Sequence, residues 1–171
     1  MKKVFTNIIN VLQKIIVVIL SLVIIMNFWL IFSRYVLKQD LPSFFGYSYA
    51  SVLSGSMEPE FCVGDLVVFK RQNDYEVGDV VIFSQSGSFI THRIVDTQDD
   101  MFITQGDAND SADIDLLDAD NIHGAMIFSL SGMGNVQNFL AQPFGMLILV
   151  FAGIRILQTP KIFKKEERLD D

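Results

Sequence analysis

The chain has 171 residues, 50% of them hydrophobic, and a formal net charge of −7. So apolar a composition excludes an ordinary soluble domain of this size and points to membrane segments. The negative charge argues against a nucleic-acid partner, because a phosphate backbone requires a basic surface. The single cysteine, Cys62, excludes an internal disulfide and is expected to pack as a small apolar residue between Phe61 and Val63.

The first predicted element is a transmembrane helix over residues 15–33, after a cytoplasmic N-terminus of residues 1–14. Ile15 to Phe32 is a run of 18 residues without a charge, which is about the minimum length for a membrane-spanning helix. The run begins too far into the chain and is too long for a typical cleaved signal peptide, and no Ala-x-Ala site follows it. We therefore expect an uncleaved signal anchor.

A second transmembrane helix is predicted over residues 139–157, and it precedes a cytoplasmic tail of residues 158–171. Basic residues gather outside both predicted spans: Lys2, Lys3 and Lys14 before the first, and Lys161, Lys164, Lys165 and Arg168 after the second. Because basic residues favour the cytoplasmic side, both termini are expected in the cytoplasm and residues 39–137 outside it.

Residues 39–137 are predicted to form one small, mainly β domain. Short apolar runs alternate with polar stretches and Gly-Asp turns, as is typical of β-strands. The predicted strands are Val63–Phe69, Val77–Phe83, Ser88–Val95, Met101–Thr104 and Gly124–Leu130. The predicted fold class is therefore a mainly β, small extracytoplasmic domain flanked by two transmembrane helices.

An aromatic cluster precedes the first of these strands and consists of Phe44, Phe45, Tyr47 and Tyr49. Aromatic side chains gather at membrane interfaces, but they also fill the buried face of strands. Two interpretations stay open: an interfacial contact that rests the domain on the bilayer, and a core strand.

His92 lies in the strand Ser88–Val95, where alternation places it on the same face as Ile90 and Ile94. A histidine on an apolar face is more often a core residue with a hydrogen-bond partner than a catalytic base. The pattern therefore leaves both roles open for His92.

The stretch Thr104–Asp120 is crowded with aspartates. It has three interpretations: a solvated acidic loop, a calcium loop, or a source of the carboxylate that orients His92. The residues at the EF-hand ligand positions are Asp107, Asn109, Ser111, Asp113, Asp115 and Asp118. However, Ala112 replaces the turn glycine and no glutamate ends the loop, so calcium is disfavoured.

The segment Ser51–Phe61, with the sequence SVLSGSMEPEF, has three small or hydroxylated residues in a row, Ser54, Gly55 and Ser56. Such a composition fits a surface turn. A serine hydroxyl becomes a strong nucleophile only when a base takes its proton and a carboxylate holds that base. Serine, histidine and aspartate occur in that order here, but the order alone is weak evidence, and His123 is a rival base.

The chain resembles the type I signal peptidases in five separated blocks. These are VLSGSMEPEF with GDLVVF after it, VGDVVIF, THRIV, QGDANDSAD and GAMIFSLSGMG. The resemblance is strongest to the Ser-His-Asp branch found in the endoplasmic reticulum (ER), in archaea and in some Gram-positive bacteria, the SipW-like enzymes. The blocks cover the predicted outer domain in order and fit the two flanking spans.

The resemblance implies a role for each residue that matches these blocks. Ser56, the second serine of the Ser-x-Ser-Met block, would be the nucleophile, and His92 its base. Asp113 would complete the triad, with Asp107 as a second, structural carboxylate. The hydroxyl of Ser54 and the backbone N–H of Ser56 would form the oxyanion hole. No cofactor and no metal ion is implied.

The implied activity is that of a membrane-bound serine endopeptidase that cleaves N-terminal signal peptides from secreted or membrane pre-proteins after small residues. The implied partners are these pre-proteins, the lipid bilayer and accessory membrane subunits. We expect a two-pass protein with its catalytic domain on the extracytoplasmic side, in a bacterial plasma membrane rather than the ER.

Three alternatives belong to other classes of function. The first is a catalytically silent two-span scaffold that binds signal sequences or fibre and pilus proteins; the intact site residues argue against it. The second is a self-cleaving, repressor-type Ser–Lys peptidase. It would have to use Lys70, because no other lysine precedes Lys161 in the outer domain. The third is a calcium-binding surface module.

Overall fold

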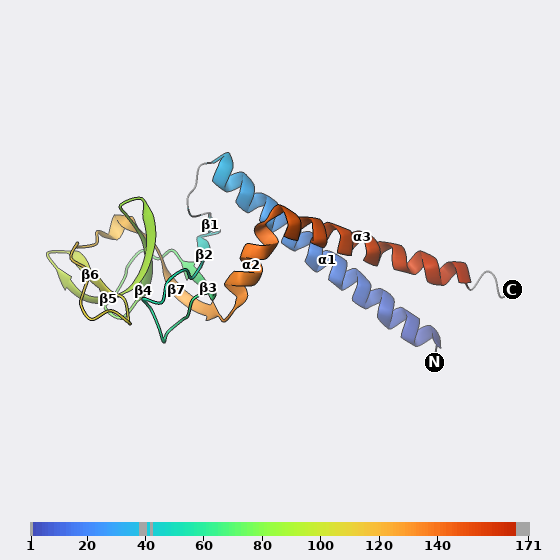
Figure 1. Cartoon of the computed structure of the whole chain (residues 1–171), viewed down its shortest axis with the longest axis horizontal. Helices are drawn as coiled ribbons and strands as arrows, with labels where there is room; N and C mark the ends of the chain where they lie inside the picture. Colours follow the sequence, from blue (N-terminus) through green and yellow to red (C-terminus); the bar gives the residue numbers. More distant parts are fainter. Residues whose placement is uncertain (1, 38–40, 42, 167–171) are drawn as a thin grey trace. The chain divides into compact units, whose positions relative to one another are not determined.

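The computed structural model describes residues 2–37, 41 and 43–166 of the protein. Parts of three predicted segments lie outside the described residues: residue 1 of the cytoplasmic N-terminus, residues 39, 40 and 42 of the outer domain, and residues 167–171 of the cytoplasmic tail, which include Arg168. The chain forms two compact units, a helical one from its two ends and a second one spanning Asp40–Asn138 (Figure 1).

The helical unit contains α1 (Lys2–Tyr35), which is longer than the predicted first span. Within it, Asn7–Ser33 is long and apolar enough to cross a membrane. The amide of Asn27 is buried and donates a hydrogen bond to the carbonyl oxygen of Val23, 2.9 Å away, so its polar group is satisfied inside the helix. In Figure 1, α1 lies beside α3 of the same unit.

The structure does not show the second predicted span as one straight helix. Residues 139–141 end α2 (Met133–Ala141), and α3 (Pro143–Glu166) begins after a break, bent by 87° from α2. Proline lacks a backbone N–H and its ring clashes with a preceding helical turn, so Pro143 starts a helix rather than continuing one. Among the described residues, α1 alone qualifies as a single-helix span, whereas α2 and α3 qualify only when taken together.

The second unit is built on one seven-stranded sheet, and all its strand pairs are antiparallel. The strands are β1 (Ser43–Phe44), β2 (Tyr47–Ser51), β3 (Leu66–Lys70), β4 (Val80–Gln85), β5 (Ser88–Gln98), β6 (Met101–Gln105) and β7 (Ile122–Leu130). A short 3-10 turn, η1 (Ala119–Asn121), precedes β7. The order in the sheet is β1-β2-β3-β7-β4-β5-β6, so β7 returns between β3 and β4. The predicted mainly β class is confirmed.

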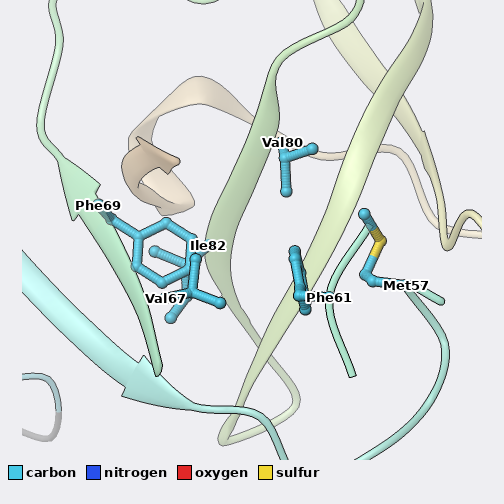
Figure 2. Packing of buried hydrophobic residues seen from close by; sticks show 6 residues of the cluster. All are labelled: Met57, Phe61, Val67, Phe69, Val80 and Ile82. Atoms are coloured by element: carbon cyan, nitrogen blue, oxygen red, sulfur yellow. The ribbon is translucent and has the colours of Figure 1, made fainter. Parts of the chain in front are cut away.

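The core consists of two apolar clusters, because alternate side chains of β4 point to opposite faces of the sheet. Val80 and Ile82 belong to one cluster, whose six buried residues are Met57, Phe61, Val67, Phe69, Val80 and Ile82 (Figure 2). Val81 and Phe83 belong to the other, with Ile94, Leu117, Ile122 and Ala125. The first cluster therefore takes two members, Met57 and Phe61, from the loop that contains Ser56.

Exposure differs along the aromatic cluster and at Cys62. Phe45 is 87% exposed and Phe44 61%, so the start of the aromatic cluster is not a core strand. Tyr49, by contrast, is half-buried on β2 and accepts a hydrogen bond from the amide of Gln137. Cys62 is exposed, so the expectation that it packs as a small apolar residue was wrong.

Candidate active site

Ser56 lies in the loop of residues 52–65, which joins β2 to β3. The loop is closed at its base, because Val52 N–H donates to the carbonyl oxygen of Asp65 and Gly64 N–H donates to that of Val52, at 2.9 and 3.0 Å. It is anchored in the core by Met57, which is 1% exposed, and by Phe61. Since Ser56 directly precedes the buried Met57, its backbone is held while its side chain stays half-buried.

The backbone of Ser56 packs against a second loop, residues 106–113. Ala108 N–H donates to the carbonyl oxygen of Ser56 at 2.8 Å. A Cβ atom on Gly106 would lie 2.6 Å from the same oxygen, so only glycine allows this approach. The hydroxyl oxygens of Ser54 and Ser56 lie 3.4 Å apart, which brings the predicted oxyanion donor and nucleophile side by side.

The second loop also holds the partner of His92. Nδ1 of His92 lies 2.7 Å from Oδ2 of Asp113, and the same carboxylate oxygen accepts a hydrogen bond from the Thr104 hydroxyl at 2.6 Å. His92 is 8% exposed on β5 and meets the ring of Phe83 edge-on. Within the described chain, the His92 ring bonds through Nδ1, which leaves Nε2 available for a second partner.

Asp107 has a different partner. Its two carboxylate oxygens accept hydrogen bonds from Nε and Nη2 of Arg93, at 2.9 and 2.6 Å. Arg93 also donates to the carbonyl oxygen of Gly78 and, at 3.4 Å, to Glu60 of the Ser56 loop. The hydrogen bonds to Asp107 raise the pKa of Arg93 above its ordinary value. The pair formed by Asp107 and the permanently charged guanidinium of Arg93 thus joins the second loop to β5.

The structure does not bring all predicted site residues into direct contact. Among the described residues, no hydrogen bond joins Ser56 to His92; the two are connected through the 106–113 loop. The register Val81↔His92 sets the imidazole on the face of the sheet opposite to the neighbouring Arg93. Catalytic hydrogen bonds are often long in enzymes without bound substrate and tighten in the complex.

Lys70 is placed unfavourably for a Ser–Lys dyad. It is the last residue of β3, whereas the Ser56 loop enters that strand at its first residue, Leu66. Its Nζ lies 5.7 Å from the ring centroid of Tyr47, and the residue is exposed.

Asp65 fastens the other end of the Ser56 loop. Its carboxylate accepts hydrogen bonds from the backbone N–H groups of Cys62 and Gly132, both at 2.8 Å, and these bonds lower the pKa of Asp65. The loop is therefore tied to the segment that leads from β7 into α2, although Asp65 itself is remote in sequence from that segment.

The remaining candidates have no catalytic geometry in the part of the chain that the structure describes. His123 packs edge-on against Phe89, and its Nε2 atom is buried without a hydrogen-bond partner. Burial, followed by the charge of Arg71, lowers the pKa of His123. In the described part of the chain, no group of three or more His, Cys, Asp or Glu side chains is arranged to hold a metal ion. The calcium interpretation therefore has no cluster of carboxylates to support it.

Comparison with known proteins adds the family. A family model described as peptidase S24-like matches residues 39–127, just over half of the chain. The chain belongs to this peptidase family. Signal peptidase I W of Bacillus subtilis (strain 168) is 38% identical over 105 residues, which cover 57% of this chain and 54% of that protein. The chain therefore spans about half the length of the curated relative that it matches.

The resemblance to SipW-like type I signal peptidases is confirmed by these matches. The peptidase S24-like match covers β1 to β6 and the first part of β7. It includes Ser54, Ser56, His92, Asp107 and Asp113.

Sequence reasoning missed three residues of the family domain that hold the site: Thr104, Arg93 and Asp65. Thr104 carried a usable signal, because a hydroxyl on the buried side of an apolar strand requires a hydrogen-bond partner. Arg93 and Asp65 gave none, since their partners come from distant parts of the chain.

Proposed function

We propose that the protein is a membrane-bound serine endopeptidase of the Ser-His-Asp type that removes N-terminal signal peptides from secreted or membrane pre-proteins. The observation that carries the proposal is the 106–113 loop, which is bonded at one end to the backbone of Ser56 and at the other to the ring of His92. A nucleophile and a base tied to one loop are positioned to meet when substrate fills the site.

The chemistry follows from these positions. Nε2 of His92 takes the hydroxyl proton as Oγ of Ser56 attacks the carbonyl carbon of the scissile peptide bond. Asp113, hydrogen-bonded to Nδ1, stabilises the resulting imidazolium. The oxyanion is held by the Ser54 hydroxyl and the backbone N–H of Ser56, worth about 3 kcal/mol per donor. His92 then gives its proton to the leaving amine, and water hydrolyses the acyl-enzyme with His92 as base. Asp107 acts as the structural carboxylate.

The proposed setting is a membrane crossed twice. The apolar helix α1 supplies one span, and α2 with α3 supplies the second, so both termini lie on the same side of the membrane. The lysines near both termini make that side the cytoplasm, and the β domain then lies outside it. The exposed Phe44 and Phe45 then rest at the bilayer interface. Because a signal peptide is itself embedded in lipid, anchoring the enzyme raises the effective concentration of its substrate. Accessory membrane subunits belong to the same proposal, and a bacterial plasma membrane is the preferred location.

The activity is tested with the full chain in detergent and a purified pre-protein that has small residues before its cleavage site. Wild type is expected to release the mature protein, and Ser56→Ala to release none. The matched control is Ser111→Ala, an exposed serine of the second loop, which should cleave at the wild-type rate. Equal cleavage by wild type and Ser56→Ala would refute the assignment of the nucleophile. Binding of the pre-protein without cleavage by wild type would favour the silent scaffold.

The topology is tested with the only cysteine of the sequence, Cys62, which is exposed on the β domain. A membrane-impermeant maleimide should label it on intact bacterial cells that produce the protein. Cys62→Ser serves as the unlabelled control. Labelling that appears only after the cells are permeabilised would place the β domain inside and contradict the proposed orientation.

A further inference from the structure

Thr104 carries a buried hydroxyl on β6, next to the His92–Asp113 pair. Thr104 is 1% exposed, and its Oγ1 donates a hydrogen bond to Oδ2 of Asp113 at 2.6 Å. This is the carboxylate oxygen that lies 2.7 Å from Nδ1 of His92. A second bond joins the same two residues, because Asp113 N–H donates to the carbonyl oxygen of Thr104 at 2.8 Å.

The strand register explains why Thr104 faces the carboxylate. Thr104 is paired with Ile94, so its side chain lies on the same face of the sheet as Ile94 and, two residues earlier on β5, His92. A hydroxyl in this apolar surrounding is costly unless it is hydrogen-bonded, and Asp113 is its partner. The backbone bond keeps the two residues together whichever way the carboxylate turns.

The carboxylate needs such a restraint. The side chain of Asp113 is 22% exposed and that of His92 is 10% exposed, so water competes for the aspartate more than for the histidine. With the imidazole as its only side-chain donor, the carboxylate would be free to rotate toward solvent. The Thr104 hydroxyl supplies a second donor on the same oxygen and removes that freedom.

We propose that Thr104 is a positioning residue for the catalytic pair. It holds Oδ2 of Asp113 on Nδ1 of His92, and thereby keeps Nε2 of His92 directed to the reacting serine. The inference rests on the proposed function and adds to it a residue that acts through the aspartate without contact to substrate.

The first test separates kcat from KM for two variants of the full chain in detergent. Thr104→Val keeps the shape and removes the hydroxyl. Its kcat should fall about 10- to 100-fold, as expected for losing a hydrogen bond to a charged group, with KM within about twofold. Thr104→Ser restores the hydroxyl and should recover most of the activity. Thr97→Val, at an exposed position of β5, controls for the exchange of threonine for valine in a strand.

A double-mutant cycle then distinguishes positioning from general support of the fold. If Thr104 acts through the carboxylate, adding Thr104→Val to Asp113→Asn should cost less than twofold more. Losses that multiply, equal losses in Thr104→Val and Thr104→Ser, or a wild-type kcat in Thr104→Val would each overturn the proposal. Ser56→Ala is assayed alongside. If Ser56→Ala is inactive while Thr104→Val is fully active, the positioning role of Thr104 is refuted but the proposed peptidase function is not.

A measurement without turnover covers the case of a protein that does not cleave the chosen pre-protein. Proton NMR of the folded protein, with histidines labelled with ¹⁵N, should show the Nδ1–H of His92, assigned by its loss in His92→Gln. Its exchange with water should quicken in Thr104→Val and return toward the wild-type rate in Thr104→Ser. An unchanged exchange rate in Thr104→Val would overturn the proposal.

Discussion

Asp107 and Asp113 lie in one loop, yet their carboxylates are bonded to different kinds of partner. Asp107 binds Arg93, whose guanidinium stays charged at any working pH. Asp113 binds His92, whose imidazole is a side chain that can accept and pass on a proton. A fixed ion pair can join two segments, whereas only the titratable partner can transfer a proton. The chemistry of the neighbour, more than the carboxylate itself, distinguishes the end of the loop bonded to Arg93, proposed to be structural, from the end bonded to His92, proposed to be reactive.

The largest effect is expected at the reactive end. Asp113→Asn keeps the size of the side chain but removes the charge that stabilises the imidazolium, so kcat should fall about a thousandfold or more. The midpoint of thermal unfolding should move little. Steady-state kinetics with a pre-protein substrate measures the first and circular dichroism the second. Asp110→Asn, an exposed aspartate of the same loop, is the control. Wild-type kinetics in Asp113→Asn would contradict the proposal that Asp113 is catalytic and Asp107 structural.

A smaller loss is expected where the loop approaches the serine. In Gly106→Ala the new Cβ meets the carbonyl oxygen of Ser56, so one of the two loops must shift. A displacement of about 1 Å costs about 100-fold in rate, which is the expected fall in kcat. Gly153→Ala, where a Cβ meets no atom within 4 Å, should leave the rate unchanged. An unaffected rate in Gly106→Ala would show that the loop contact does not position the nucleophile.

The structural end should respond in stability more than in rate. Asp107→Asn loses the charge-assisted pair with Arg93, whose side chain is 30% exposed, so the free energy of unfolding should fall by about 1 kcal/mol. The expected fall in kcat is about tenfold at most. Denaturant unfolding and the peptidase assay are run on the same preparation. A loss of rate as large as that of Asp113→Asn would mean that both carboxylates take part in the chemistry.

The smallest effect is expected at the second histidine, and it concerns pH. Burial lowers the pKa of His123 below its ordinary value of 6.5, so the unfolded chain takes up a proton first as the pH falls. The stability that His123 contributes is complete above pH 6.5 and is lost as the pH falls through its lowered pKa. Thermal unfolding of His123→Gln should therefore lose less stability between pH 7 and 5 than wild type, with activity within about twofold. A large loss of activity in His123→Gln would indicate that His123, instead of His92, acts as the base.

Local patterns in the sequence were enough to predict much of the β domain. The alternation in Ser88–Val95 correctly placed His92 and Ile94 on the buried face of β5, because side chains alternate in any strand. The five predicted strands match β3 to β7. In the region of β1 and β2 a strand was only one of two open interpretations, since an aromatic cluster fits an interface and a strand equally well. The bend at Pro143 was missed because the apolar run continues across it.

The local features of this protein follow from the sequence alone: a long apolar helix at the N-terminus, Gly-Asp turns, short alternating strands and the motifs of the family. Which distant residues become partners is visible only in the folded chain. These partnerships are the insertion of β7 between β3 and β4, the hydrogen bonds of Arg93 to Asp107 and of His92 to Asp113, and the contact of Thr104 with that aspartate. Each joins segments that are separate in the sequence. Periodicity reports which face of a strand is buried. Periodicity does not report which strand lies beside a given strand, because the energy of pairing is gained only when the whole sheet assembles.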